Sequence, residues 1–353
     1  MFAQGSKISM ESILYSNFIK YDRLRDLIYQ EFKGSDATKV NVYIDLNSFL
    51  NGCYRSLSQD LYTIPAICLN YCAHLRAFFN KLGVGTNITM VYGLPRSPNN
   101  TRYMVEYWNK KYKNQDAVDQ QIEFGNNILQ VLSPYFNDIY FKYGTVESGV
   151  IIKHLMDSVF NNGLPNIVVS TSEYIFQLPA FSNCVVLHKK REQDAGNKID
   201  ASYSYNASTA INRYIFEVRK VTSILWIIPE MVSSLICMMG MPQRNVSCII
   251  SVPRAFEIMR RIDMQSWLSV YGDITQMYSL MLANMTSKES NALSFGEYLN
   301  RFKAIDINYQ LTLYRSLPES ADNSFLVRLH DPDKIKEINN NLFINTPINL
   351  EWL

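Results

Sequence analysis

The chain has 353 residues, of which 47% are hydrophobic and 19% charged, and its formal net charge is +2. This composition excludes wholesale disorder and predicts a sizeable buried core in one large domain or two modest ones. Proteins that live on nucleic acid usually carry a clear basic excess or a basic stripe. The near balance of charge therefore argues mildly against a duplex-binding role.

The six cysteines stand in apolar contexts and do not form a metal-binding pattern. Cys68 and Cys72 are four residues apart, but there is no second pair, and the four histidines lack zinc-site spacing. We therefore expect buried free thiols, no metal, and a reducing, intracellular setting. We expect a soluble protein. No apolar run follows Lys7, so we expect no secretory signal. Pro229 and Glu230 interrupt the most apolar run, 224–241, so we expect no membrane span.

The first part of the chain alternates short β-branched runs with longer helical stretches. Such alternation predicts an α/β domain at residues 39–190, in which helices cover both faces of a parallel sheet. Residues 1–38 are expected to form an N-terminal helical extension. The expected strands are 40–46, 87–93, 138–144, 166–172 and 182–189, and the expected helices are 9–33, 64–83, 117–136 and one that starts near Glu147.

After residue 190 the pattern changes. Residues 189–208 are polar and are expected to form a loop. The region 191–330 is expected to be mostly helical from residue 229 on, and residues 331–353 to form a C-terminal docking tail. Chain ends seldom become ordered unless something holds them, so we expect both 1–38 and 331–353 to act as docking arms. The expected helices in this half lie near 253–263, 265–286 and 293–303.

Five short segments, in order along the chain, combine strand ends or helix starts with polar residues. They are "YIDLNSFLNGCYRS" (43–56), "MVYGLPRSPNNTRYMVEYWNKKYKN" (90–114), "VESGVII" (146–152), "VVSTSEYIFQL" (168–178) and "LICMMGMPQRNVSCIISVPRAFEIMRRI" (235–262). Together they resemble the flap-endonuclease or 5′-nuclease family, the structure-specific branch of the PIN-like nucleases. The resemblance implies a three-layer PIN-like sheet followed by a helical region derived from a helix-hairpin-helix.

The resemblance also implies where metal ligands would stand. The family uses Mg²⁺ or Mn²⁺ held by carboxylates at neighbouring strand ends. Of the matching positions, only Asp45 and Glu147 still carry a carboxylate, so we expect no catalysis, no cofactor and a vestigial site. The full set of matching positions is Asp45, Tyr92, Glu147, Gly149, Val150, Ser172, Tyr174, Met241 and Arg244.

The DNA-binding hairpin of the family departs from its pattern as well. Glycines there let a phosphate approach backbone N–H groups, because a glycine has no Cβ. The matching positions here carry Cys248, Ser251 and Pro253, and the proline also removes a donor. Loss in both halves predicts a scaffold that has been kept for another purpose.

The first function predicted is therefore a non-catalytic pseudo-nuclease, a structural or adaptor subunit of a larger assembly with protein partners. Richness in Asn, Tyr and Ile suggests a bacteriophage or large DNA virus, with the protein in the host cytoplasm or a virion. One alternative is a pseudo-nuclease that binds single-stranded or branched DNA or RNA. Its candidate contacts are Arg102, Lys110, Lys111 and Lys113.

Another alternative is a metal-dependent 5′-nuclease with a rearranged site, which would use Asp45, Glu147 and either Asp157 or Glu173. Purely structural roles compete with each of these site hypotheses. Asp45 can cap a helix or bond to Ser48, and Glu147 can complement a helix dipole. The lysines of 109–113 can form a solvated helix face, and the aromatic residues beside them can belong to the core.

Overall fold

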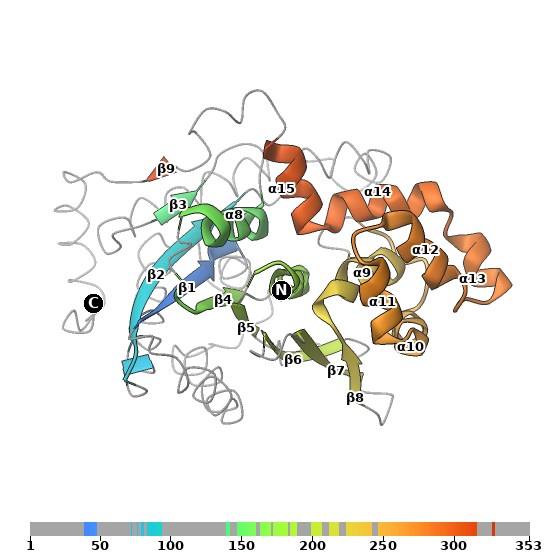
Figure 1. Cartoon of the computed structure of the whole chain (residues 1–353), viewed down its shortest axis with the longest axis horizontal. Helices are drawn as coiled ribbons and strands as arrows, with labels where there is room; N and C mark the ends of the chain where they lie inside the picture. Colours follow the sequence, from blue (N-terminus) through green and yellow to red (C-terminus); the bar gives the residue numbers. More distant parts are fainter. Residues whose placement is uncertain are drawn as a thin grey trace, which may run out of the picture.

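A computed structural model describes the molecule, and its helices and strands are shown in Figure 1. The predicted N-terminal helix, the helix at 117–136 and the C-terminal tail lie outside the described residues. Of the predicted helix 64–83, Cys72, Arg76, Phe79 and Asn80 are helical, and Gly83 follows with a φ of 74°. The structure describes residues 39–47, 72, 76, 79–80, 83–93, 139–141, 147–159, 163–170, 172–182, 184–188, 199–206, 212–218, 224–241, 246–315 and 327–328.

A mixed sheet runs through the α/β part, with the strand order β8-β7-β6-β5-β4-β1-β2-β3-β9 (Figure 1). Its central strands β5, β4, β1, β2 and β3 are all parallel, which confirms the predicted parallel sheet. These strands are β1 (Lys39–Asp45), β2 (Gly85–Tyr92), β3 (Ile139–Phe141), β4 (Asn166–Ser170) and β5 (Cys184–His188).

Strand β1 shows why these segments form a central sheet. Its sequence KVNVYID is rich in β-branched residues, and every residue after Lys39 is buried. It is hydrogen-bonded to β2 on one side and β4 on the other. A strand flanked on both sides and covered on both faces suits such an apolar run.

Antiparallel strands extend the sheet at both edges. Strand β6 pairs with β5 and β7 with both β6 and β8, while β9 pairs with β3. The prediction of a loop at 189–208 is therefore wrong for residues 199–206, which form a strand. The added strands are β6 (Ile199–Asn206), β7 (Asn212–Val218), β8 (Ile224–Ile227) and β9 (Val327–Arg328).

Helices cover the sheet and then gather at one end of the molecule, beyond β8 (Figure 1). Where one long helix was predicted at 265–286, two occur, because Gly272 has a φ of 96° and Asp273 caps the next helix. The helical elements are α8 (Ser148–His154), η2 (Leu155–Val159), η3 (Glu173–Ala180), η4 (Pro229–Met231), α9 (Val232–Met239), α10 (Val252–Arg261), α11 (Met264–Val270), α12 (Ile274–Leu282), α13 (Ser287–Ala292), α14 (Phe295–Ile305) and α15 (Ile307–Arg315).

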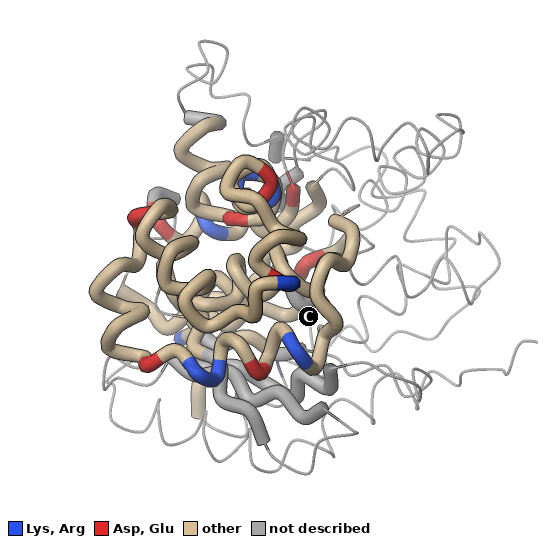
Figure 2. Tube along the Cα trace, turned by 90° about the vertical axis from the view of Figure 1, so that its right-hand side faces the viewer, with Lys and Arg blue, Asp and Glu red and all other residues tan. Residues whose placement is uncertain are grey.

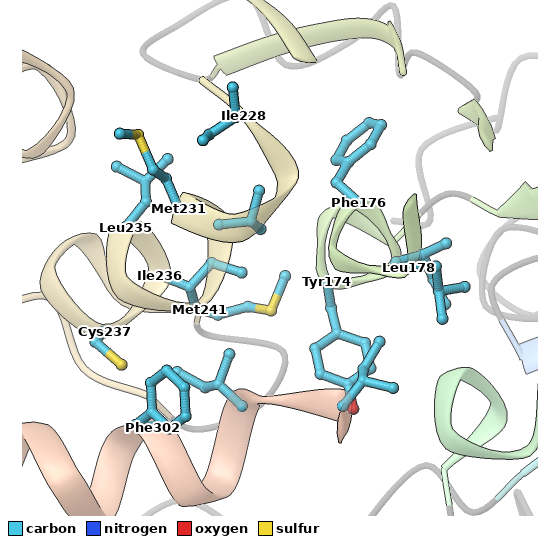
Figure 3. Close-up of a cluster of buried hydrophobic side chains, with 14 of the residues drawn as sticks. Tyr174, Phe176, Leu178, Ile228, Met231, Leu235, Ile236, Cys237, Met241 and Phe302 are labelled. Atoms are coloured by element: carbon cyan, nitrogen blue, oxygen red, sulfur yellow. The ribbon is translucent and has the colours of Figure 1, made fainter. Parts of the chain in front are cut away.

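One hydrophobic cluster joins the sheet to the helical region. It includes Val168 of β4, Tyr174 of η3, Ile236 of α9 and Trp267 of α11, all at most 1% exposed. Figure 3 shows side chains of α9 pointing toward η3 across this apolar space. Within the described ranges, no helix is long and apolar enough to cross a membrane.

Candidate functional site at the strand ends

Asp45 ends β1, and Ser170 ends the neighbouring parallel strand β4. The carboxyl ends of parallel strands meet at one edge of a sheet, which is where ligands bind in open α/β folds. The Ser170 hydroxyl donates to Asp45 Oδ2 at 2.7 Å, and Asp45 is only 2% exposed. Ser48, the partner that we had considered for Asp45, lies outside the described residues.

Asn47, just after β1, is hydrogen-bonded to Gly93, just after β2. Its Nδ2 donates to the carbonyl oxygen of Gly93 at 2.7 Å, and the Gly93 N–H donates back to its Oδ1 at 2.7 Å. The paired bonds hold the turn after β1 against the end of β2. Tyr92, which stands where the family has a carboxylate, ends β2 and is 4% exposed.

Glu147 stands at the start of α8, as the sequence predicted. It has extended backbone angles, and its carbonyl oxygen accepts from the N–H groups of Val150 and Ile151, both at 3.1 Å. The side chain is 4% exposed. This position at a helix N-terminus fits a carboxylate that complements the helix dipole.

Gly149 and Tyr174 together fill the place next to Glu147. A Cβ on Gly149 would lie 2.8 Å from Tyr174 Cε1 and 3.3 Å from Ile307 Cδ1. The Tyr174 hydroxyl donates to Gln310 Oε1 at 3.2 Å. The pKa of Tyr174 is raised by burial, and the negative charges of Asp306 and Asp45 add to the effect. An aromatic ring thus occupies space where the family resemblance implies acidic ligands.

The other predicted site positions lie around this ring or beyond the described part of the chain. Ser172 precedes η3, and Val150 is 1% exposed in α8. Met241 is 3% exposed, and its side chain lies in the apolar space between α9 and η3 (Figure 3). Arg244 and the proposed nucleic-acid contacts Arg102, Lys110, Lys111 and Lys113 lie outside the described residues.

A buried polar network locks η3 to the helical region. The Ser233 hydroxyl lies 2.8 Å from Gln177 Oε1 and 2.9 Å from Asp306 Oδ2, and Gln177 Nε2 donates to the Ile305 carbonyl oxygen at 3.1 Å. Burial raises the pKa of Asp306, although hydrogen bonds from the Tyr309 N–H and Ser233 oppose the rise. This network fixes the place of α15, and therefore of Gln310 beside Tyr174.

Residues 240–251, called the hairpin below, connect α9 to α10. Gly240 has a φ of 76°, and Met241 and Val246 form an antiparallel bridge that closes the turn; residues 242–245 lie outside the described part. Cys248 and Ser251 are exposed, and Pro253 stands in the first turn of α10. The described residues thus run helix, closed turn, helix, although all three positions that are glycine in the resembled family carry exposed side chains.

The described residues do not by themselves fit the paired metal ions that the fold family implies. Two magnesium ions need several carboxylate oxygens, and only Asp45 and Glu147 supply them at the matched positions. Among the residues that the structure describes, no group of three or more His, Cys, Asp or Glu could hold a metal ion.

The residues weighed for a rearranged site are placed as follows. Asp157 accepts from Lys153 Nζ at 2.7 Å and from the Ser182 hydroxyl at 3.1 Å. Lys153 belongs to α8 and Ser182 follows η3, so the two bonds link Asp157 of η2 to both of these elements. Glu173 begins η3, one residue after Ser172. The structure thus engages Asp157 in an ion pair, which is a structural role.

The fold and this strand-end edge define a class: an α/β domain with a parallel sheet and a helix-hairpin-helix region. The chain has this architecture in common with the D15 protein of bacteriophage T5, crystallised with metal ions. The TM-score is 0.51 at 13% identity, over 85% of this chain and 99% of that chain. The likeness establishes the 5′-nuclease fold that the sequence predicted.

Other T5 structures give similar values. A single-residue mutant of the T5 5′-exonuclease has a TM-score of 0.48 at 11% identity, over 85% of this chain and 99% of that chain. A mutant T5 flap endonuclease, a pseudo-enzyme–product complex with DNA and metal ions, has a TM-score of 0.47 at 12% identity, over 87% of this chain and 98% of that chain. No protein-family model and no curated protein sequence matches the chain.

These comparisons correct one prediction. We expected the chain not to be an enzyme, and that prediction is wrong: the solved structures that it is similar to are 5′-exonucleases and flap endonucleases. The prediction had two grounds, the carboxylates missing at positions matched by motif and the glycines missing from the hairpin. Both grounds test only the matched positions, whereas ligands of a folded site come from any segment that reaches it.

Several residues of the site region were not predicted. Gln177 and Ser170 lie in the matched segment 168–178 but were given no role, and Ser233, Arg301 and Gln310 were not singled out. The Tyr174–Gln310 bond joins residues 136 apart, and the Ser233–Asp306 bond joins residues 73 apart. Such contacts leave no local signal in the sequence, so they could be found only from the fold.

Proposed function

We propose that this chain is a nucleic-acid-binding protein built on the 5′-nuclease fold, and that the hairpin contacts the phosphate backbone of single-stranded or branched DNA or RNA. One observation carries the proposal: the described residues on both sides of the turn, 240–241 and 246–251, are arranged as a closed connection between α9 and α10. Its supports are the positive φ of Gly240, the Met241–Val246 bridge and the start of α10 at Val252. Backbone N–H groups at such a turn and at a helix N-terminus suit a phosphate.

The charges around the hairpin are compatible with modest affinity. Figure 2 shows basic and acidic residues interleaved along the described helices. On α10, Arg254 is paired with Glu289 and Glu257, and Arg261 is paired with Glu257. Contacts in this region would therefore depend mainly on backbone donors, with side-chain cations largely neutralised.

The experiment is an anisotropy titration with labelled flap DNA, single-stranded DNA and single-stranded RNA, in EDTA, at several salt concentrations. We expect affinity to fall as salt rises, with a log–log slope of about −0.7 for each phosphate contacted on a single strand. Binding should persist in EDTA, because the proposal requires no metal. No binding to any of the three at about 50 mM salt would overturn it. A parallel arm with Mg²⁺ or Mn²⁺ reports cleavage.

A matched pair of variants localises the binding. Ser251 is exposed at the N-cap of α10 and makes no side-chain capping bond, so Ser251→Glu places a negative charge at the end of the hairpin without removing a cap. Ser269 is an exposed serine on α11 and is not part of the hairpin, so Ser269→Glu is the control. We expect the first to weaken binding about tenfold and the second to change it little.

A second candidate is a structural or adaptor subunit of a larger, viral assembly, in the host cytoplasm or a virion. It is favoured by the burial of Tyr92, Val150, Tyr174 and Met241, which are all at most 4% exposed. The resemblance implies that these positions face a ligand, whereas their side chains here are buried. The titration separates the two candidates, because a subunit that works through protein partners need not bind any of the three nucleic acids.

A further inference from the structure

Arg301 of α14 is 2% exposed, and it lies beneath the hairpin. A charged side chain is almost never fully buried unless it is paired. Its five N–H donors are all engaged, which a guanidinium achieves only in a site of matching geometry. Nη1 donates to the carbonyl oxygens of Cys237 at 3.1 Å and Ser247 at 2.6 Å, Nη2 to Ser247 Oγ and Glu297 Oε1 at 2.8 Å each, and Nε to Glu297 Oε1 at 3.1 Å.

The bond to the Ser247 carbonyl oxygen fixes the direction of one peptide unit. The described residues contain no cis peptide, and in a trans peptide the C=O and the N–H point in opposite directions. Because the Ser247 C=O points inward to Arg301, the N–H of Cys248 in the same unit points outward. Cys248 is itself exposed.

Gly240 packs against the flat face of the Ser247–Cys248 peptide unit. A Cβ at Gly240 would lie 2.6 Å from Cys248 N and 2.6 Å from Ser247 C. No larger residue fits there without moving the hairpin. The Ser247–Cys248 peptide is thus fixed by a guanidinium at its oxygen and by the chain at its face.

We infer that Arg301 is a positioning residue for phosphate binding: it turns and polarises the Ser247–Cys248 peptide so that the Cys248 N–H is presented to a phosphate of nucleic acid. A cation bonded to a peptide oxygen strengthens the N–H of that peptide as a donor, since linked hydrogen bonds polarise one another. The role rests on the proposed function. Arg301 acts through the hairpin backbone, because its own side chain is buried.

The alternative is that Arg301 only braces the core, since its bond to the Cys237 carbonyl oxygen also ties α14 to α9. The two roles differ in what a small guanidinium ion can repair. In Arg301→Ala, added guanidinium fits the vacated site and bonds the same carbonyl oxygens, whereas sodium at equal ionic strength does not. Arg260→Met is the matched control, because it removes an exposed cation from α10.

The experiment measures the affinity for labelled single-stranded DNA and the hydrogen exchange of the Cys248 amide in the full chain. We expect Arg301→Lys and Arg301→Ala to weaken binding about tenfold or more and to speed exchange at Cys248. In Arg301→Ala, guanidinium at millimolar concentration should restore much of the DNA affinity and of the slow exchange at the Cys248 amide. It should change neither quantity in the wild-type chain. Arg260→Met should change affinity by less than about threefold.

The outcomes separate the inference from the proposed function. If the wild-type chain binds no nucleic acid, the proposed function fails and this role fails with it. If the wild-type chain binds and both Arg301 variants bind equally well, only the inference is overturned. It is also overturned if Arg301→Lys stays folded, exchanges faster at Cys248 and keeps its affinity, since the hairpin order would then not serve binding.

Discussion

The ring of Tyr174 lies so close to Gly149 that a Cβ on the glycine would be 2.8 Å from Tyr174 Cε1. The two residues come from η3 and α8, and both stand at positions where the 5′-nuclease resemblance implies a carboxylate. The loss of a side chain at 149 and the gain of a ring at 174 are therefore complementary. Together they form packed core at the carboxyl ends of the strands.

This complementarity predicts a strong coupling between the two positions. Gly149→Ala should destabilise the fold by about 1–3 kcal/mol, because Tyr174, Ile175 and Ile307 surround the new methyl group. In a Tyr174→Leu background the same change should cost at least about 1 kcal/mol less, since the ring is gone. Urea unfolding of the four chains of this double-mutant cycle measures the coupling. Additive effects would mean that the ring does not fill the space over residue 149.

Asp45 and Ser170 give a second test. Ser170→Ala removes the hydroxyl that donates to the buried Asp45 carboxylate, so we expect a loss of about 1–3 kcal/mol. The control is Ser279→Ala on α12, which removes an exposed hydroxyl bonded to the Thr275 carbonyl oxygen. It should change stability by no more than about 0.5 kcal/mol. Equal effects in the two variants would show that the Asp45–Ser170 bond adds nothing specific.

Asp306 predicts a pH dependence of stability. Burial raises its pKa above the ordinary value of 3.8, so its folded state holds a proton more tightly than its unfolded state. Its contribution to stability is fully present below pH 3.8 and is lost as the pH rises through the folded pKa. The unfolding free energy of the wild-type chain, relative to Asp306→Asn, should therefore fall as the pH is raised from about 4 to 7.

Asp273 provides a control of opposite sign. Hydrogen bonds from the backbone N–H of Gln276, opposed by partial desolvation, lower the pKa of this exposed N-cap below 3.8. Its contribution is present above pH 3.8 and is lost as the pH falls through the folded pKa. Relative to Asp273→Asn, the wild-type chain should become less stable on acidification. If both comparisons move in the same direction, the buried environment assigned to Asp306 is incorrect.

The sequence predicted the parts of the fold that local patterns encode. Strand β1 and the start of α8 at Glu147 were both expected, because β-branched runs and helix-start residues act within a few positions. Strand β6 was missed, since its polar composition suggested a loop. Yet Ile199, Ala201, Tyr203 and Tyr205 alternate with polar residues along it, which is a strand period.

The candidate site was only partly predictable, for the same physical reason. Asp45, Asn47 and Glu147 were found from motifs, and the structure brings them to one edge of the sheet. The groups that complete the region act across the chain: Arg301 bonds to a carbonyl oxygen 64 residues away. No propensity or spacing encodes such contacts, because they depend on how whole elements pack.

Thiol protection tests the central claim, that the hairpin contacts nucleic acid, most directly. Cys248 is exposed on the hairpin, whereas Cys72, Cys184 and Cys237 are buried. Burial raises the pKa of Cys72 to about 12 and raises the pKa values of Cys184 and Cys237 as well, so these thiols should react slowly with iodoacetamide in the folded chain. Mass spectrometry then follows the alkylation of Cys248 against that of the buried thiols.

With saturating single-stranded or flap DNA, we predict that alkylation of Cys248 slows at least about fivefold, because a phosphate held at its N–H covers the neighbouring thiol. The rates of the buried thiols should not change. Ser251→Glu should reduce the protection at the same DNA concentration, because it is expected to bind about tenfold more weakly. If the chain binds DNA while Cys248 reacts at its unbound rate, the nucleic acid lies elsewhere and the account of the hairpin is contradicted.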